Sequence, residues 1–276
     1  MKRLICLILS LILTLSLWGC GKEETAQETT LPEPKETVRY GHTPTEAAPT
    51  ETTETPTEAE VTVEVKDVFV DKAVMLDYDE TYYYHIPSIH ISGVNTDEVN
   101  KLMYHELYSF IDQYVYENPD YPYLGDMGYL WTVREGIVSV ITEVIIGPDS
   151  SPNPMYIIYN VDIATGQQVS DEDLIASFGL EKQTYRDQVA AALAKTYVDL
   201  FAEYHAQNPE DSFYQTQYDN TVSEDNINNV RPYIDVTGEL CVMADIYSLA
   251  GADCYRHLVC VSGAVEPSYP KAEPFE

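Results

Sequence analysis

Basic residues are scarce in this sequence: 15 Lys and Arg stand against 46 Asp and Glu, which gives a formal net charge of −31 at pH 7. Proteins that bind nucleic acid need a basic surface to neutralise phosphates and release counterions, so nucleic acid is excluded as a partner. A negative field favours cationic partners instead. The alternative is that the surface carboxylates only keep an exported protein soluble.

The motifs of the common enzyme classes are also missing. The chain has no Gly-x-Ser-x-Gly, no His-Glu-x-x-His, no Cys-x-x-Cys and no glycine-rich phosphate loop. The carboxylate run Asp171–Asp173 stands where a helix is expected to begin, and acidic residues there indicate helix capping. We therefore expect a non-catalytic protein with no metal site and no cofactor.

Long apolar runs are absent except at the N-terminus. Two basic residues precede the apolar stretch Leu4–Leu17, which is too short to span a bilayer comfortably and is typical of a signal peptide. Leu17-Trp18-Gly19-Cys20 follows and resembles the lipobox of bacterial lipoproteins, whose cysteine is acylated. We predict a lipoprotein signal peptide at 1–19, lipidation of Cys20, and a lipid anchor on the extracytoplasmic face of the cell membrane. An ordinary cleaved signal or an uncleaved anchor is the alternative.

Residues 20–60 have almost no large apolar side chains and are rich in Thr, Glu and Pro. Such a segment cannot bury enough surface to offset its ordering entropy, so it is predicted to be a disordered tether. Residues 61–263 show strand and helix patterns and are predicted to form the folded domain. Residues 264–276 are predicted to be a loose tail.

Two helical patterns stand among many strand patterns. One helix is predicted from the cap pair Asn95 and Glu98 to Val115, and another over Tyr185–Gln207. Strands are predicted at 61–70, 73–76, 82–92, 129–134, 137–146, 155–163, 232–236, 239–247 and 254–262. Because helices and strands do not alternate regularly, we expect an α+β fold. It would be a two-layer antiparallel sheet packed against two long helices, with sub-halves at about 61–147 and 148–263.

The segment Tyr159–Leu174 is predicted to be the hub of this domain. A strand ending at Ile163 is followed by the turn Thr165-Gly166, since glycine reaches positive φ without a steric penalty. Residues 167–169 then return as a short strand. Ser170, with Asp173 three residues later, is typical of a capping box that opens a short helix.

This hub resembles the hallmark segment of the RsiV-like family of bacterial extracytoplasmic domains. Members typically carry an aromatic-Asn-hydrophobic-Asp segment, then Thr-Gly, then a short acidic helix; here these are Tyr159–Asp162, Thr165-Gly166 and Asp171–Leu174. The family occurs in a lysozyme-sensing anti-sigma factor and beside polysaccharide-deacetylase domains. The resemblance implies an exported α+β module that binds or senses a partner, with a basic wall-acting protein such as lysozyme as the candidate. It acts either alone or as an accessory module to an envelope enzyme. Members often have Gly-Gly-Ala-His where this chain has Gly147–Ser151, so no role of that histidine is expected here.

Tyrosine is abundant, with 23 residues against 6 Phe. Several tyrosines crowd around the segment 114–131, and tyrosine combines broad contact area with a hydrogen-bonding tip, which suits protein interfaces and sugar rings. The candidate ligand-binding residues are Tyr121, Tyr123, Tyr129 and Trp131, for a cationic protein or for cell-wall glycan. The alternative is that these rings pack under the loop or on the sheet.

Three cysteines follow Cys6 of the leader and Cys20. If the strands at 239–247 and 254–262 pair as a hairpin with Tyr247 opposite Cys254, Cys241 faces Cys260. Export makes a disulfide between these two a candidate. Three thiols leave one over, so reduced, buried cysteines remain the alternative.

Overall fold

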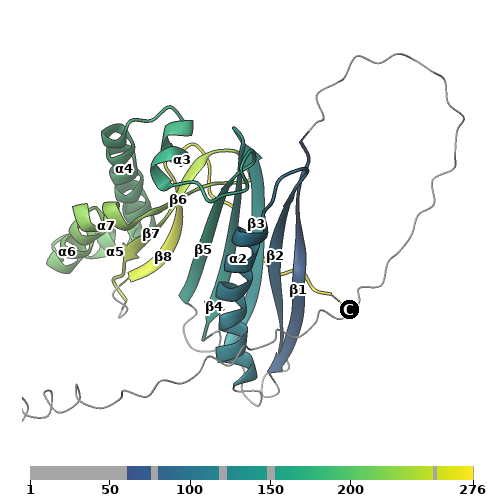
Figure 1. Ribbon diagram of the computed structural model, residues 1–276. Helices are drawn as coiled ribbons and strands as arrows, with labels where there is room; N and C mark the ends of the chain where they lie inside the picture. Colours follow the sequence, from purple (N-terminus) through teal and green to yellow (C-terminus); the bar gives the residue numbers. More distant parts are fainter. Residues whose placement is uncertain (1–60, 76–79, 118–122, 148–152, 251–253, 276) are drawn as a thin grey trace, which may run out of the picture. The chain divides into compact units, whose positions relative to one another are not determined.

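The computed structural model describes residues 61–75, 80–117, 123–147, 153–250 and 254–275 (Figure 1). The predicted signal peptide, Cys20, the tether and Tyr121 lie outside the described residues. The described residues belong to one unit, Glu58–Glu276, and form an α+β fold with two sheets. Among them, no helix has the length and apolar character that a membrane-spanning segment requires.

The first sheet has five strands in sequence order. They are β1 (Val63–Met75), β2 (Glu80–Ile91), β3 (Leu124–Arg134), β4 (Ile137–Ile146) and β5 (Asn153–Asp162). Its neighbours pair antiparallel except β2 and β3, which are parallel, with Tyr84 opposite Met127. The predicted antiparallel sheet is therefore mixed, because a helix connects β2 to β3 and such a crossover returns the chain in the same direction. β1 joins the two strands predicted at 61–70 and 73–76, with an irregularity opposite Pro87.

The second sheet is the predicted three-strand meander. It consists of β6 (Arg231–Ile234), β7 (Leu240–Tyr247) and β8 (Cys254–Cys260), paired antiparallel in that order. One face of this sheet packs on β4 and β5 through a buried cluster that includes Ile141, Tyr156, Tyr233 and Leu258. The two sheets are thus stacked against each other.

Helix α2 (Asp97–Ile111) covers the other face of the first sheet (Figure 1). Its buried residues recur at helical spacing: Val99, Met103, Leu107 and Ile111. A π-helical turn, η1 (Asp112–Tyr116), extends it. The predicted cap is displaced by one residue, because Thr96 is the N-cap, while the Asn95 side chain accepts a hydrogen bond from the Asp97 N–H at 2.8 Å.

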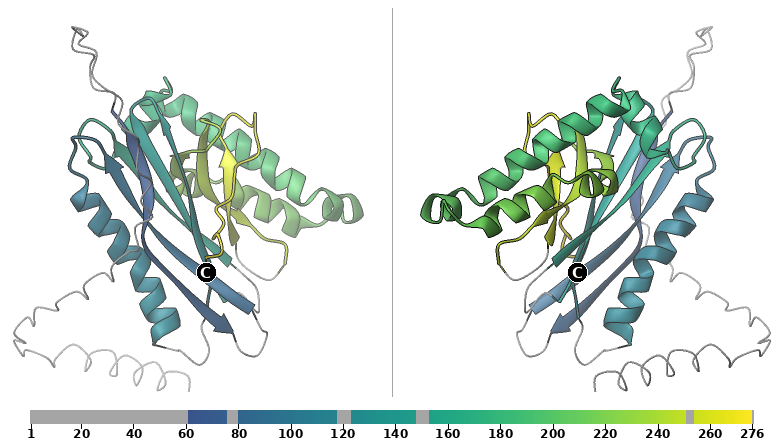
Figure 2. Two further views of the ribbon diagram at one scale, coloured as in Figure 1. Left: turned by 90° about the vertical axis from the view of Figure 1, so that its right-hand side faces the viewer. Right: turned by 90° about the vertical axis from the view of Figure 1, so that its left-hand side faces the viewer.

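The second predicted helix is interrupted. α4 (Lys182–Leu200) and α5 (Ala202–Gln207) are separated by Phe201, whose φ of −111° and ψ of 18° are not helical and whose ring packs on Tyr197. α4 packs on the outer face of the second sheet, so α2, the two sheets and α4 follow one another (Figure 2). The predicted two layers are replaced by this stack, because the meander covers the first sheet in place of a second helix.

Three short helices complete the fold. α3 (Asp171–Ser177) follows the hub as predicted, with the Ser170 hydroxyl accepting from the Asp173 N–H at 3.1 Å. α6 (Ser212–Thr221) and α7 (Glu224–Asn229) occupy a stretch in which the sequence analysis predicted no helix. Their sequences carry few large apolar side chains, which explains why hydrophobic periodicity did not indicate them.

The hub contacts α2 and the residues just before it. The Tyr159 hydroxyl donates to Glu106 of α2 at 2.6 Å. Gly166 has a φ of 70°, and a Cβ at this position would lie 2.2 Å from the Asn95 carbonyl oxygen, so only glycine fits the turn. The predicted return strand is a single bridge between Val161 and Gln168.

Asn160 connects the two sheets. Its Nδ2 donates to the Pro232 carbonyl at 3.0 Å, and its Oδ1 accepts from the Ser139 hydroxyl at 2.8 Å. The same Ser139 oxygen accepts from the Ile234 N–H at 3.1 Å. Asn160 and Ser139 are both buried, so this network satisfies polar groups that water does not reach. The predicted division near residues 147 and 148 does not follow the sheets, because β5 pairs with β4.

The C-terminal segment packs on the sheets, although it has no helix or strand. Ser268 N–H donates to Asp235 at 2.8 Å, the Glu273 carbonyl bonds His85 Nε2 at 2.7 Å, and the Phe275 ring lies 5.4 Å from that of Tyr83. Figure 2 shows the segment on the side of the first sheet away from α2. The predicted loose tail is thus wrong as far as residue 275, because these backbone and ring contacts fix it.

A half-buried carboxylate on β4 gives the fold a predicted pH dependence. Burial and the nearby Asp126 raise the pKa of Glu143, although the Tyr156 hydroxyl partly opposes them. A raised pKa in the folded state means that Glu143 stabilises the fold at low pH and that this contribution is lost as pH rises through the raised value. Glu143→Gln should therefore raise Tm relative to the parent at pH 7, and the difference should shrink as the solution is acidified. Exposed Glu210→Gln is the control; a pH-independent difference for Glu143→Gln would contradict this assignment.

Candidate functional site

The structure does not bring the predicted tyrosine and tryptophan residues together. Tyr123 is 40% exposed and precedes β3, whereas Trp131 is 37% exposed and lies towards its other end. Eight residues of strand at about 3.3 Å each place them roughly 25 Å apart along the strand. Tyr129 packs at the edge of a core cluster, and burial with the neighbouring Asp67 raises its pKa. Tyr121 lies outside the described residues, so the rest of the set forms no single binding surface.

A different aromatic surface lies along α2 and η1. The rings of Tyr104 and Tyr108 stack with centroids 5.3 Å apart, and Phe69 of β1 meets both edge-on. Tyr116 of η1 continues the row 6.2 Å from Tyr108 and is 41% exposed. Tyr104 and Tyr108 are half-buried. We call Tyr104, Tyr108 and Tyr116 the α2 face; the i, i+4 spacing of its first two tyrosines is the one sign of it in the sequence.

The segment that carries the α2 face is strongly acidic. The acidic residues of α2, η1 and the residue after them are Asp97, Glu98, Glu106, Asp112 and Glu117, against the single basic side chain Lys101. The helix macrodipole favours acids at the N-terminal end and cations at the C-terminal end. Asp112 and Glu117 are exposed at the C-terminal end, where they do not help the helix. Helix capping therefore does not explain why these two acids are there.

Most cations elsewhere in the described part of the chain are already neutralised. Six side chains pair with carboxylates: Lys66, Lys182, Arg186, Lys195, Arg231 and Arg256. Exposed pairs of this kind contribute only about 0–1 kcal/mol to stability. Their larger effect is on the electrostatic field of the domain. Because most cations are paired, the remaining carboxylates make this field negative.

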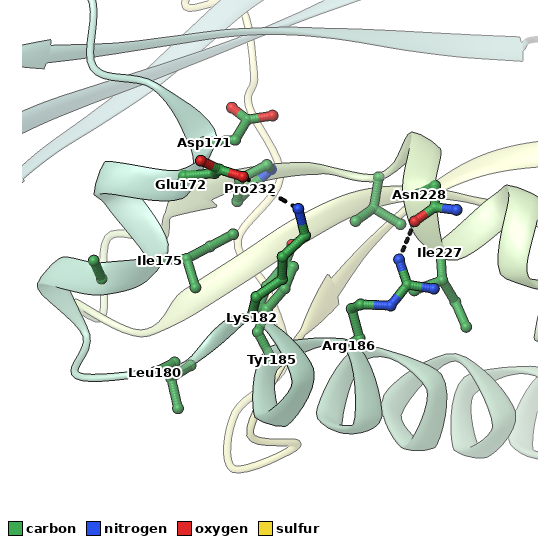
Figure 3. Close-up of a pocket in the computed structure, with 12 residues that line it drawn as sticks. Asp171, Glu172, Ile175, Leu180, Lys182, Tyr185, Arg186, Ile227, Asn228 and Pro232 are labelled. Carbon is green, nitrogen blue, oxygen red and sulfur yellow. Dashed lines mark hydrogen bonds and ion pairs between the residues drawn. The ribbon is translucent and has the colours of Figure 1, made fainter.

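A pocket of about 480 Å³ opens between α3, α4, α7 and β6 (Figure 3). Its volume lies within the range of about 300–1,000 Å³ that is usual for ligand sites. Apolar side chains form much of its wall: Ile175, Ala176, Leu180, Ile227, Val230 and Pro232. This pocket was not predicted from the sequence, because its lining comes from two segments, 171–186 and 227–232, that are distant in the chain.

Charged side chains stand at the edge of this pocket in two groups. Asp171 and Glu172 come from the first turn of α3, and Lys182 and Arg186 come from the first turns of α4 (Figure 3). Lys182 Nζ lies 3.2 Å from Glu172 Oε1. Asp171 is paired with Arg231 at 3.6 Å; burial raises the pKa of Asp171 and Arg231 lowers it, with burial the larger effect.

The other side of the pocket is fixed by buried amides. Asn226 of α7 donates to the Asp245 carbonyl of β7 at 2.8 Å, and Gln217 of α6 donates to the Ser248 carbonyl at 2.7 Å. These bonds hold α6 and α7 on the second sheet together with apolar contacts of Tyr214 and Ile227. Arg186 then joins α4 to α7 through Glu224 at 3.1 Å and through Asn228.

Tyr185 is the one lining residue that combines deep burial with a polar group. It is 5% exposed, and its hydroxyl has no hydrogen-bond partner in the described part of the chain. Figure 3 shows its side chain rising from α4 towards Pro232. Burial, and the nearby Asp171, raise the pKa of Tyr185, so the phenol stays protonated and can donate a hydrogen bond. Leaving such a group unpaired costs about 1–3 kcal/mol.

The predicted position of two cysteines opposite each other on neighbouring strands is confirmed. Cys241 lies opposite Cys260, and Tyr247 opposite Cys254. Since Val261 N–H bonds the Leu240 carbonyl, the Cys241–Cys260 pair is a non-hydrogen-bonded one, in which side chains approach most closely. Both are buried between the sheets as free thiols, so the disulfide itself stays a prediction.

The two thiols differ in their acidity. Burial, followed by the neighbouring Cys260, raises the pKa of Cys241. Burial also opposes ionisation of Cys260, but hydrogen bonds from the Ser262 hydroxyl and nearby backbone N–H groups outweigh it and lower the pKa. Cys260 is therefore the better nucleophile for thiol–disulfide exchange.

Air-oxidised, exported protein is expected to contain the Cys241–Cys260 disulfide. Closing a loop of this size should stabilise the fold by about 3 kcal/mol in the chain-entropy view. Peptide mapping by mass spectrometry without reductant checks the bond, and chemical denaturation with and without reductant checks its contribution. A Cys254→Ser chain is the control and should behave like the parent. Finding both thiols alkylatable after unfolding of oxidised protein would contradict the prediction.

The comparisons with known proteins give no family for this chain. No family model matches the sequence, and no curated protein matches it. In the described residues, no group of three or more His, Cys, Asp or Glu side chains is arranged to hold a metal ion.

Proposed function

We propose that this chain is a lipid-anchored cell-surface protein whose folded domain binds a basic extracellular protein and does not itself catalyse a reaction. The observation that carries the proposal is the α2 face: the exposed ring of Tyr116 continues the half-buried rings of Tyr104 and Tyr108, and the helix carries several carboxylates and one lysine. Tyrosine is enriched in protein interfaces, and complementary charge steers a basic partner to an acidic surface. The anchor at Cys20 is part of the proposal; fatty-acid labelling of the parent but not of Cys20→Ser tests it.

The geometry of η1 supports the same surface. Its Glu117 N–H bonds the Asp112 carbonyl five residues earlier at 3.0 Å, which is the π-helical pattern. Such turns are rare and occur frequently at functional sites. Here the turn places Tyr116 beside Asp71 and Tyr108. The resemblance of the hub to RsiV-like domains makes lysozyme the first partner to test.

Neutralising Asp112 and Glu117 together is expected to weaken lysozyme binding about thirtyfold at low salt. A charge pair at about 4 Å in water is worth about 1 kcal/mol, and two charges are removed. The Asp112→Asn/Glu117→Gln chain should fold at least as well as the parent, because these acids oppose the helix dipole. Calorimetric titration with lysozyme measures the affinity.

Two controls separate this surface from net charge alone. Glu210→Gln/Asp225→Asn makes the same change in charge at exposed positions near α6 and α7 and should have little effect. Succinylated lysozyme, whose lysines have become carboxylates, should not bind. Equal losses in both double variants, or no binding to lysozyme at all, would contradict the proposed surface.

The alternative partner is cell-wall glycan. The stacked rings of Tyr104 and Tyr108 offer the flat aromatic surface that suits a sugar ring. Purified peptidoglycan tests it in a pull-down with the parent and Tyr108→Ala. Binding that depends on Tyr108 but not on Asp112 and Glu117 would favour glycan over a basic protein.

A further inference from the structure

The geometry points to a second binding site: the pocket between α3, α4 and α7 takes a small zwitterion with an aliphatic side chain, of the size of an amino acid or a dipeptide. This site is separate from the α2 face and does not depend on it. Its apolar wall comes from Ile175, Leu180, Ile227 and Val230 among others. Such a wall stabilises an aliphatic side chain by removing its surface from water.

The unpaired hydroxyl of Tyr185 is the observation that indicates a ligand. A phenol this deeply buried normally has a partner, and native proteins leave few such groups unsatisfied. Tyr197, further along the same helix and also buried, donates to the Tyr214 carbonyl at 2.9 Å. A polar atom of a bound molecule would supply the bond that Tyr185 lacks.

The arrangement of charge specifies the ligand further. Asp171 and Glu172 stand on the α3 side of the opening, and Lys182 and Arg186 on the α4 side (Figure 3). The lining is therefore balanced, although the whole chain carries a formal charge of −31. A lone anion would face the α3 acids and a lone cation the α4 bases. A molecule with both charges satisfies both sides, with its ammonium towards α3 and its carboxylate towards α4.

A ligand can replace the ion pair that now lies at the opening of the pocket. Lys182 and Glu172 are about four-fifths exposed, and such pairs are worth little in water. A zwitterion can take over both partners at once, because each of its ends meets a charge of opposite sign. Partial desolvation by the apolar wall then strengthens these contacts relative to the exposed pair.

Four leucine compounds test this assignment with the intact domain. L-leucine and the dipeptide L-leucyl-L-leucine carry both charges, L-leucinamide lacks the carboxylate, and N-acetyl-L-leucine lacks the ammonium. NMR shift titration should show saturable binding of L-leucine or the dipeptide, and about tenfold weaker binding of both capped forms, since each loses a charge-assisted contact. Which of the two zwitterions binds more tightly distinguishes an amino-acid site from a dipeptide site.

Tyr185→Phe should weaken zwitterion binding about fivefold to tenfold without unfolding the domain, because only the hydrogen bond is lost. Tyr233→Phe removes a buried hydroxyl between the sheets and is the matched control, with unchanged binding expected. Lysozyme binding should be unaffected by Tyr185→Phe, so failure here and failure of the α2 face are distinguishable. No saturable binding of either zwitterion at millimolar concentration, equal binding of the capped forms, or unchanged binding by Tyr185→Phe would each overturn the proposal.

Discussion

Replacement of Asn160 by leucine is expected to lower the free energy of unfolding by about 3 kcal/mol, even though leucine has a similar size and is more hydrophobic. The substitution leaves the Pro232 carbonyl without its donor and the Ser139 hydroxyl without its acceptor, both of them buried. Each unpaired buried group costs about 1–3 kcal/mol. The lost free energy should come from the contact between the two sheets, because the hydrogen-bond network joins them. Urea denaturation followed by circular dichroism measures it.

A double-mutant cycle isolates the network. Ser139→Ala alone removes the acceptor of the Ile234 N–H as well as the donor to Asn160. Residues in one hydrogen-bond network show coupling energies of about 0.5–3 kcal/mol. The double variant should therefore lose clearly less than the sum of the single losses. Additive losses, or a loss below about 0.5 kcal/mol for Asn160→Leu, would show that this network does not hold the sheets together.

Gly128→Ala is expected to release the C-terminal segment. A Cβ at Gly128 would lie 2.2 Å from the Lys271 carbonyl carbon and 2.3 Å from the Ala272 nitrogen. Both are backbone atoms, so a rotamer change cannot relieve the contact. Overpacking of this kind costs about 1–3 kcal/mol, and the terminal segment is the part that can move.

Trypsin reports this release directly, because the bond after Lys271 is the one that lies against Gly128. The parent should be cut there slowly and Gly128→Ala much faster. Gly179→Ala is the control: its φ of 69° strains any other residue by about 1–2 kcal/mol, but nothing lies within 4 Å of the added carbon. Equal cleavage of both variants would mean that general destabilisation, and not the contact with residue 271, exposes the segment.

Local patterns in the sequence were sufficient to predict the hub and the register of the cysteine hairpin. The turn at Gly166, the Ser170 cap and the pairing of Cys241 with Cys260 depend on spacing within a few residues or one hairpin. Such features are set by local stereochemistry and by strand alternation, which the sequence shows directly. The role of Asn160 between the sheets was not visible, because its partner Pro232 is distant in the chain.

Three features of the fold depend on tertiary contacts and were not predicted: the parallel strand pair, helices α6 and α7, and the packed C-terminal segment. The strand–helix–strand order from β2 through α2 to β3 is a signal for a parallel pair, but the surrounding hairpins obscured it. Helices α6 and α7 are held by buried amides such as Gln217 and Asn226, which hydrophobic periodicity does not detect. The tail lacks a regular pattern, and its contacts with His85 and Asp235 arise only after the sheets have formed.

The candidate sites show the same limit. A count of tyrosines near residues 114–131 predicted an aromatic surface, but β3 carries Tyr123 and Trp131 to separate ends. The α2 face instead contains two i, i+4 neighbours on one helix, and Phe69 from a strand packs against both of them. The pocket was beyond prediction because Tyr185 appears in the sequence as an ordinary helix residue. Only the packing of α7 and β6 against α4 encloses it.

The association rate constant for lysozyme, measured by stopped-flow mixing over a range of ionic strength, tests most directly whether this acidic domain attracts a basic partner. Electrostatic steering predicts a rate constant that falls about tenfold or more from low to high salt, while dissociation changes much less. Asp112→Asn/Glu117→Gln should flatten that dependence. An association rate constant indifferent to salt, or no association in low salt, would contradict the account.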